Sequence, residues 1–202
     1  MTNKRIVYEF EECPYCEKTR RTLDWVGMDY ERFHVDPGDR SEVLEVSGQE
    51  LVPVLVDGED VVPDSTRIFE YLDEEYDLTV DLIPVDPSIR AQAYILNRYA
   101  EDVWGSLGYR AQKSIDKNGN SLSAEGAEEL QNEIDQAATL LDDYFTGCGF
   151  AVGDSMTMAD ISLSSFVSRI LECSDYSISE RHQDLWTWYN RVEETIHEPA
   201  AA

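Results

Sequence analysis

The chain has 202 residues, of which 42 are Asp or Glu and 16 are Lys or Arg, so its formal net charge is -26 at pH 7. With 42% hydrophobic and 10% aromatic residues it can bury a core, as one large domain or two modest ones. The acidic balance excludes the basic surface of a nucleic-acid-binding protein, and anionic lipid would repel such a chain.

Strand and helix patterns alternate over residues 1–77. RIVYEF predicts a strand, Pro14 suits the first turn of a helix that stops near Gly27, and DYERFHV alternates like a second strand. DRSEVLEVSG predicts a short helix. LVPVLVDGEDVVPD predicts two strands joined at Asp57-Gly58, and STRIFEYLDEEY predicts an amphipathic helix. The order β-α-β-α-β-β-α indicates an α/β domain over this part of the chain.

Residues 78–88 contain Pro84 and Pro87 and are typical of a linker, and strand signals then disappear. The pattern SIRAQAYILNRYAEDVWGSLGYRAQKSI predicts one long helix, bent near Gly105 or Gly108. Three further segments have helical periodicity: AEGAEELQNEIDQAATLLDDYFTG, TMADISLSSFVSRILE and RHQDLWTWYNRVEETI. We therefore expect an all-helical domain over residues 89–202.

Several features of the second half are expected to serve folding rather than chemistry. Thr157 and Asp160 have the spacing of a capping box. Cys148 and Cys173 are expected to be small buried hydrophobic residues. Three aromatic residues of the last helix are expected to pack in the core or at a domain interface: Trp186, Trp188 and Tyr189.

The cysteines of CPYC, Cys13 and Cys16, allow three interpretations. Half a zinc site would need two more ligands, but the other cysteines stand alone and the three histidines form no pair, so we expect no metal. Two incidental core cysteines would have no reason to follow a strand and open a helix. A thiol–disulfide pair accounts for both the spacing and the position.

Position at a helix start favours Cys13 as the reactive thiol. Cys13 falls at the N-cap, where the free N–H groups of Tyr15 and Cys16 can point at its sulfur. Such placement lowers a cysteine pKa from about 8.5 to about 3.5–7.5. Cys16 lies one turn into the helix, so we expect it to be more buried and to act as the resolving thiol.

Two further motifs accompany CPYC. Pro53 in LVPVL interrupts a predicted strand, which on its own indicates an edge or a bend. PDS at residues 63–65 precedes a helix, and Asp64 or Ser65 can cap its first amides. Together with CPYC after the first strand, these motifs resemble glutaredoxin. With the helical second half, nearly the whole chain resembles the glutaredoxin-type members of the glutathione S-transferase superfamily, which have a thioredoxin-like domain followed by a helical domain.

The resemblance implies a binding site for a thiol peptide. It implies that Pro53 is cis, that the backbone of Val52 pairs with the cysteinyl part of the peptide, and that the helix start at Asp64 and Ser65 holds the γ-glutamyl carboxylate; Tyr15 is also placed at this site. Many relatives have Glu where this chain has Asp64. A second-substrate pocket is implied for four residues of the long helix: Tyr94, Arg98, Tyr99 and Asp102.

By this resemblance, we expect a thiol–disulfide oxidoreductase without a tightly bound cofactor that acts on low-molecular-weight thiols and disulfides, with glutathione or γ-glutamylcysteine as cosubstrate. Conjugation of a thiol peptide to an electrophile is the alternative, for which Tyr8 on the first strand could stabilise the thiolate. A non-catalytic partner-binding protein is a third. The superfamily allows a monomer or a homodimer.

Three carboxylates surround the reactive motif: Glu11, Glu12 and Glu17. Acidic residues are spread along the whole chain, whereas lysine occurs only at Lys4, Lys18, Lys113 and Lys117. This composition resembles that of proteins adapted to a very salty cytoplasm, where screening over about 3 Å weakens charge repulsion. The N-terminus lacks the apolar run of a secretory signal, and no stretch approaches about 20 apolar residues, so we expect a cytoplasmic protein.

Overall fold

The structure is a computed structural model that describes residues 4–114, 122–173 and 175–197. Contacts between Cα atoms divide these residues into two compact units, one comprising 4–85 with 195–197 and the other 86–194. The boundary in the chain falls after Val85, within the segment that the sequence predicts to be a linker. In the described ranges, no helix is long and apolar enough to cross a membrane.

The first unit contains a four-stranded sheet and three helices. In chain order its elements are β1 (Arg5–Glu9), α1 (Pro14–Trp25), β2 (Glu31–His34), α2 (Ser41–Ser47), β3 (Val54–Asp57), β4 (Asp60–Pro63) and α3 (Ser65–Glu75). This order confirms the predicted β-α-β-α-β-β-α pattern. Gly27 follows α1 with a φ of 69°, in the left-handed region that glycine favours, and so provides the predicted stop.

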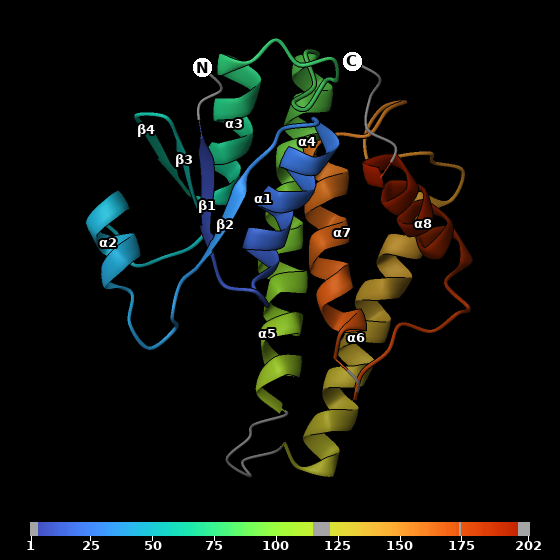
Figure 1. The fold of residues 1–202 in the computed structure, drawn as a ribbon. Helices are drawn as coiled ribbons and strands as arrows, with labels where there is room; N and C mark the ends of the chain where they lie inside the picture. The colour runs from blue at the N-terminus through green and yellow to red at the C-terminus, as the bar shows by residue number, and fades with distance from the viewer. Residues whose placement is uncertain (1–3, 115–121, 174, 198–202) are drawn as a thin grey trace. The chain divides into compact units, whose positions relative to one another are not determined.

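The strand order is β2-β1-β3-β4; β1 pairs parallel with β2 and antiparallel with β3, which in turn pairs antiparallel with β4. Helices α1 and α3 lie side by side against one side of the sheet, and α2 lies on the other side (Figure 1). Side chains alternate between the two faces along each strand, because a strand has a period of two. Tyr8 and Val54 therefore pack against Val43 of α2.

The second unit is helical, and in the described residues its elements are α4 (Pro87–Tyr99), η1 (Ala100–Trp104), α5 (Gly105–Ser114), α6 (Ala124–Phe145), α7 (Met158–Leu171) and α8 (Gln183–His197, whose last turn belongs to the first unit). The predicted bend in the long helix corresponds to η1, a π-helical turn that ends immediately before Gly105. Gly108 serves packing instead, since a Cβ atom there would lie 3.2 Å from the Cγ of Arg169 on α7.

The buried carboxylate of Asp160 connects three segments of the second unit by hydrogen bonds. Helix α7 is buried along nearly its whole length, and its first turn carries the predicted capping box, in which Thr157 and Asp160 bond each other's backbone amides. The fully buried Asp160 carboxylate also accepts from the backbone N of Ala151 at 2.7 Å and from the indole N of Trp188 at 2.8 Å. Burial raises the pKa of Asp160 to about 6, although these donors oppose the rise.

The expected burial of the remaining cysteines is half right. Cys173 is buried, but Cys148 is exposed, because it follows the end of α6 in the loop toward α7 rather than lying on a helix face. Trp188 is fully buried and stacks on Phe145 with ring centroids 4.2 Å apart, which confirms its role in packing.

Replacing Asp160 by alanine should lower the free energy of unfolding by about 2–4 kcal/mol, because it leaves buried N–H donors of Ala151, Thr157 and Trp188 unpaired. Denaturant unfolding of the full chain measures this change. The exposed Asp143 on α6 provides a control with the same change of charge, and Asp143→Ala should stay within about 0.5 kcal/mol of the parent. Equal losses in both variants would show that Asp160 has no special structural role.

Candidate active site

Strand register brings the three sequence motifs to one end of the sheet. Tyr8 of β1 pairs with Val54 of β3, and Val54 pairs with Pro63 of β4. The segment after β1 holds CPYC, the segment before β3 holds Val52 and Pro53, and the segment after β4 begins with Asp64. Because β3 runs antiparallel to both β1 and β4, the end of β1, the start of β3 and the end of β4 lie at the same end of the sheet. The three motif segments are therefore brought together there.

The two cysteines open helix α1. Cys13 is its N-cap, with Pro14 as the first helical residue, and Cys13 is half-buried whereas Cys16 is fully buried. The pKa of the Cys13 thiol is lowered, first by a hydrogen bond from the Cys16 thiol and further by the backbone N–H groups of Cys16 and Tyr15 and the charge of Arg20; burial opposes this. Burial, and then the bond to Cys13, strongly raises the pKa of Cys16.

The Val52–Pro53 peptide bond is cis, as the resemblance implies. The backbone C=O of Pro53 accepts from the backbone N of Asp64 at 3.3 Å. This bond extends the pairing of β3 and β4 by one residue and fixes the start of α3 beside the proline segment.

Asp64 and Ser65 have different roles at the start of α3. The Asp64 carboxylate accepts from the backbone N of Thr66 at 2.8 Å and of Arg67 at 3.1 Å, so Asp64 is the cap; its backbone has a φ of 76°, which is rare for a residue other than glycine. Ser65 is only 2% exposed, and its hydroxyl has no hydrogen-bond partner in the described part of the chain. A buried hydroxyl of this kind, at a helix N-terminus, suits a polar anionic ligand group.

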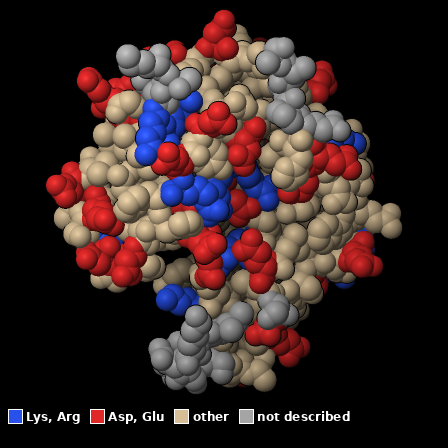
Figure 2. Space-filling model, in the orientation of Figure 1, with Lys and Arg blue, Asp and Glu red and all other residues tan. Residues whose placement is uncertain are grey.

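Acidic side chains are spread over the visible face, while Lys and Arg gather in a few patches (Figure 2). Of the three carboxylates around CPYC, Glu11 and Glu12 are exposed, and Glu17 accepts from Arg21 at 2.7 Å. Pairing with Arg21 partly offsets the charge of Glu17, so the site is less negative than the sequence suggests.

One functional candidate was missed by the sequence analysis. Glu9, at the end of β1, is fully buried and accepts from Arg20 of α1 at 2.5 Å; Arg32 of β2 also donates to it. The available signal was the alternation of β1, which places Glu9 on the same face as the buried Val7. A carboxylate at an inward position needs a positive partner.

The four residues predicted for a second-substrate pocket belong to the second unit, on α4 and η1. Arg98 donates to Asp102 at 2.7 Å on the surface of the helix. Burial raises the pKa of Tyr99. Their role in substrate binding stays a prediction.

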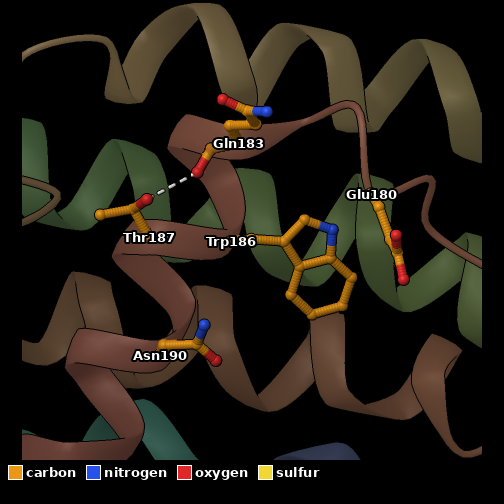
Figure 3. A pocket seen from close by; sticks show the side chains of 5 residues that line it. All are labelled: Glu180, Gln183, Trp186, Thr187 and Asn190. Atoms are coloured by element: carbon orange, nitrogen blue, oxygen red, sulfur yellow. Dashed lines mark hydrogen bonds between the residues drawn. The ribbon is translucent and has the colours of Figure 1, made fainter.

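An open cavity of about 500 Å³ lies on the second unit and is lined by Glu180, Gln183, Trp186, Thr187 and Asn190 (Figure 3). Its polar groups are partly engaged, since Thr187 donates to the backbone C=O of Gln183 at 2.7 Å and the Trp186 indole donates to that of Ser179 at 3.2 Å. The cavity contains no thiol, so the paired cysteines are the better candidate for chemistry.

Family models match both parts of the chain. The model for the glutathione S-transferase N-terminal domain matches residues 7–80, and that for the C-terminal domain matches residues 111–197. The chain belongs to the glutathione S-transferase superfamily. The matches confirm the predicted architecture of a thioredoxin-like domain followed by a helical domain.

Individual relatives are similar over nearly their whole length. The chain is 25% identical over 197 residues to a protein named "Probable glutathione S-transferase MSR-1" from Nicotiana plumbaginifolia, which covers 95% of this chain and 86% of the relative. A glutathione S-transferase structure from the Antarctic clam Laternula elliptica has a TM-score of 0.76 at 25% identity, covering 95% and 91% of the two chains. A delta-class glutathione transferase from Nilaparvata lugens has a TM-score of 0.80 at 22% identity, covering 94% and 88%.

These similarities concern the superfamily. The glutaredoxin-like use of CPYC and the adaptation to high salt stay predictions, because the relatives are named as transferases and nothing in their names concerns redox chemistry or salt.

A limiting amount of iodoacetamide at pH 6 should label Cys13 at least about tenfold faster than Cys148, although Cys148 is the more exposed. At this pH a thiol with an ordinary pKa of about 8.5 is less than about 1% thiolate, whereas the lowered pKa of Cys13 gives it a larger thiolate fraction. The buried Cys16 and Cys173 should react only after unfolding. Peptide mass spectrometry reports each site, and faster labelling of Cys148 would contradict the electrostatic account of Cys13.

Proposed function

We propose that this protein is a thiol–disulfide oxidoreductase that uses Cys13 as nucleophile and Cys16 as resolving thiol. One observation carries the proposal: two cysteines in hydrogen-bond contact at the start of α1 have pKa values displaced in opposite directions. A pair that divides into a thiolate and a protonated thiol has the two species that thiol–disulfide exchange requires.

The reaction follows from this division. The Cys13 thiolate attacks one sulfur of a disulfide R–S–S–R′, forms a Cys13–S–S–R bond and releases R′S⁻. Cys16 then loses its proton, attacks the Cys13 sulfur and releases R as a thiolate, which leaves a Cys13–Cys16 disulfide. Two molecules of a low-molecular-weight thiol reduce this disulfide and are themselves oxidised to a disulfide. Alternatively, one such thiol resolves the mixed disulfide directly, without Cys16.

The thiol is best assigned as a γ-glutamyl peptide, glutathione or γ-glutamylcysteine. Support comes from the buried Ser65 hydroxyl at the start of α3, which has no hydrogen-bond partner among the residues that the structure describes and suits the carboxylate of a γ-glutamyl group. The backbone of Val52, before the cis proline at the same end of the sheet, can pair with the cysteinyl part like an added strand. Turnover of the two mixed disulfides, measured side by side, distinguishes the thiols.

Cys13→Ser should abolish reduction of a mixed disulfide between glutathione and a small thiol, by a factor of at least about 10³, because serine is not a thiol nucleophile. Cys16→Ser should retain most of this activity with added glutathione, since the free thiol resolves the mixed disulfide. Cys148→Ser, a change at an exposed thiol outside the site, should match the parent. Unchanged turnover in Cys13→Ser would overturn the proposal.

Ser65→Ala should raise the KM for the mixed disulfide about tenfold with little change in kcat, because the hydroxyl is assigned to binding and not to the sulfur chemistry. Steady-state kinetics measure both constants. The adjacent Thr66, whose hydroxyl accepts from Lys18 at 3.0 Å, offers a comparison, and Thr66→Val should affect KM less. A loss confined to kcat would contradict a binding role for Ser65.

Conjugation of a thiol peptide to an electrophile is the second candidate, favoured by the names of the relatives. The ring of Tyr8, the residue that the sequence offers for this chemistry, packs against Phe33 with centroids 4.6 Å apart. Conjugation of glutathione to an aryl halide separates the two functions. Full conjugation by Cys13→Ser together with loss in Tyr8→Phe would favour the transferase activity.

A further inference from the structure

An ion pair between a buried carboxylate and a half-buried guanidinium links the strand before CPYC to the helix that CPYC opens. Glu9 ends β1 four residues before Cys13, and its carboxylate is fully buried. Arg20 donates to it at 2.5 Å from α1. Arg20 is four positions after Cys16, so both side chains lie on one face of the helix, about one turn apart. The pair therefore joins the strand that leads into CPYC to the helix that leaves it.

The charges around Glu9 sum to a positive value. Arg20 and Arg32 both bind this one carboxylate, and the Nδ1 of His34 lies 3.7 Å from it. The strand register explains the grouping, because Val7 pairs with Arg32 and Glu9 pairs with His34. These four strand residues therefore point to the same face of the sheet. The two guanidinium groups and the one carboxylate together give a net charge of about +1 within a chain of net charge -26.

We propose that Glu9 and Arg20 are positioning residues for the thiol site: Glu9 anchors the Arg20 guanidinium on the helix that carries the cysteines, and the two opposite charges add to the difference by which Cys13 becomes the thiolate while Cys16 keeps its proton. The proposal rests on the proposed function for the roles of the two thiols. It goes beyond that function by assigning the division of labour to a pair outside the CPYC motif.

The charges of Arg20 and Glu9 act in opposite directions on the thiols, and Arg20 interacts electrostatically with Cys16 as well. The charge of Arg20 lowers the pKa of Cys13, after the larger effects of Cys16 and the backbone amides, and the charge of Glu9 raises that of Cys16, after the larger effects of burial and Cys13. On α1, Glu17 also lies beside the cysteines, but it is paired with Arg21. Before the helix, Glu11 and Glu12 are exposed to solvent and screened by it. The Glu9 side chain is fully buried, so its charge is the least screened of these, whereas Arg20 is 16% exposed.

The test is the pKa of Cys13 in the full chain with both cysteines present, obtained from the pH dependence of its alkylation rate by peptide mass spectrometry at the lowest ionic strength at which the chain stays folded. Arg20→Gln should raise this pKa by about 0.5–1 unit, because it removes a positive charge that lowers it. Glu9→Gln should lower it by a similar amount, because the anchored positive charge is then no longer offset. Arg20→Lys, which keeps the charge, should stay within about 0.3 unit of the parent.

Arg110→Gln supplies the matched control. Arg110 donates to Glu133 at 2.5 Å, as Arg20 does to Glu9, but it lies on α5 of the second unit. This variant should leave the Cys13 pKa unchanged. Shifts of the same sign in Arg20→Gln and Glu9→Gln would mean that both only disturb packing, and no shift in either would mean that the pair does not act on the sulfur; both results overturn the proposal. If Arg20→Gln does not fold, the sign of the Glu9→Gln shift decides.

Alkylation uses no disulfide substrate, so this experiment does not depend on turnover. Opposite pKa shifts in a protein that fails to reduce mixed disulfides would support the electrostatic proposal and reject the proposed function. Reduction of mixed disulfides without opposite pKa shifts would support the proposed function and reject the electrostatic proposal.

Discussion

The chemistry proposed for this protein depends on the hydrogen bond between two thiols at the first turn of α1. Cys13 can become a thiolate because Cys16, buried and protonated, donates to it and because the free amides of the helix start face the same sulfur. The rest of the first unit maintains this arrangement. The sheet sets where α1 begins, and its register brings the cis-proline segment and the start of α3 to the same end.

Charge at this site is organised in two layers. Exposed carboxylates continue the acidic surface up to the CPYC motif, where solvent screens them, and Arg21 offsets Glu17. On the other side of this charge balance, the buried carboxylate of Glu9 binds the half-buried Arg20 and the exposed Arg32. An acidic surface and a stable thiolate are therefore compatible, since the Cys16 thiol and the backbone amides lower the pKa of Cys13 and the charge of Arg20 adds to their effect.

The sequence predicted the fold well because its signals were local. Pro14, Gly27 and the Asp57-Gly58 turn each fix a boundary through backbone preferences, and the structure places boundaries there. What the sequence could not predict depends on contacts between distant segments. The partners of Glu9 come from α1 and β2, and Cys148 is exposed because of its place after α6. Folding also buries the Ser65 hydroxyl without a hydrogen-bond partner among the described residues. The sequence pattern predicted a bend near Gly105 or Gly108, and the structure has a π-helical turn that ends immediately before Gly105.

The central claim is that Cys13 is the residue that bonds to the sulfur of the substrate, and trapping that bond tests it most directly. Cys16→Ser, which lacks the resolving thiol, is mixed with one equivalent of oxidised glutathione and digested under acidic, non-reducing conditions. Mass spectrometry should find the peptide containing Cys13 carrying glutathione, with the peptides of Cys148 and Cys173 unmodified. Modification of Cys148 alone, with Cys13 left as a free thiol, would contradict the account.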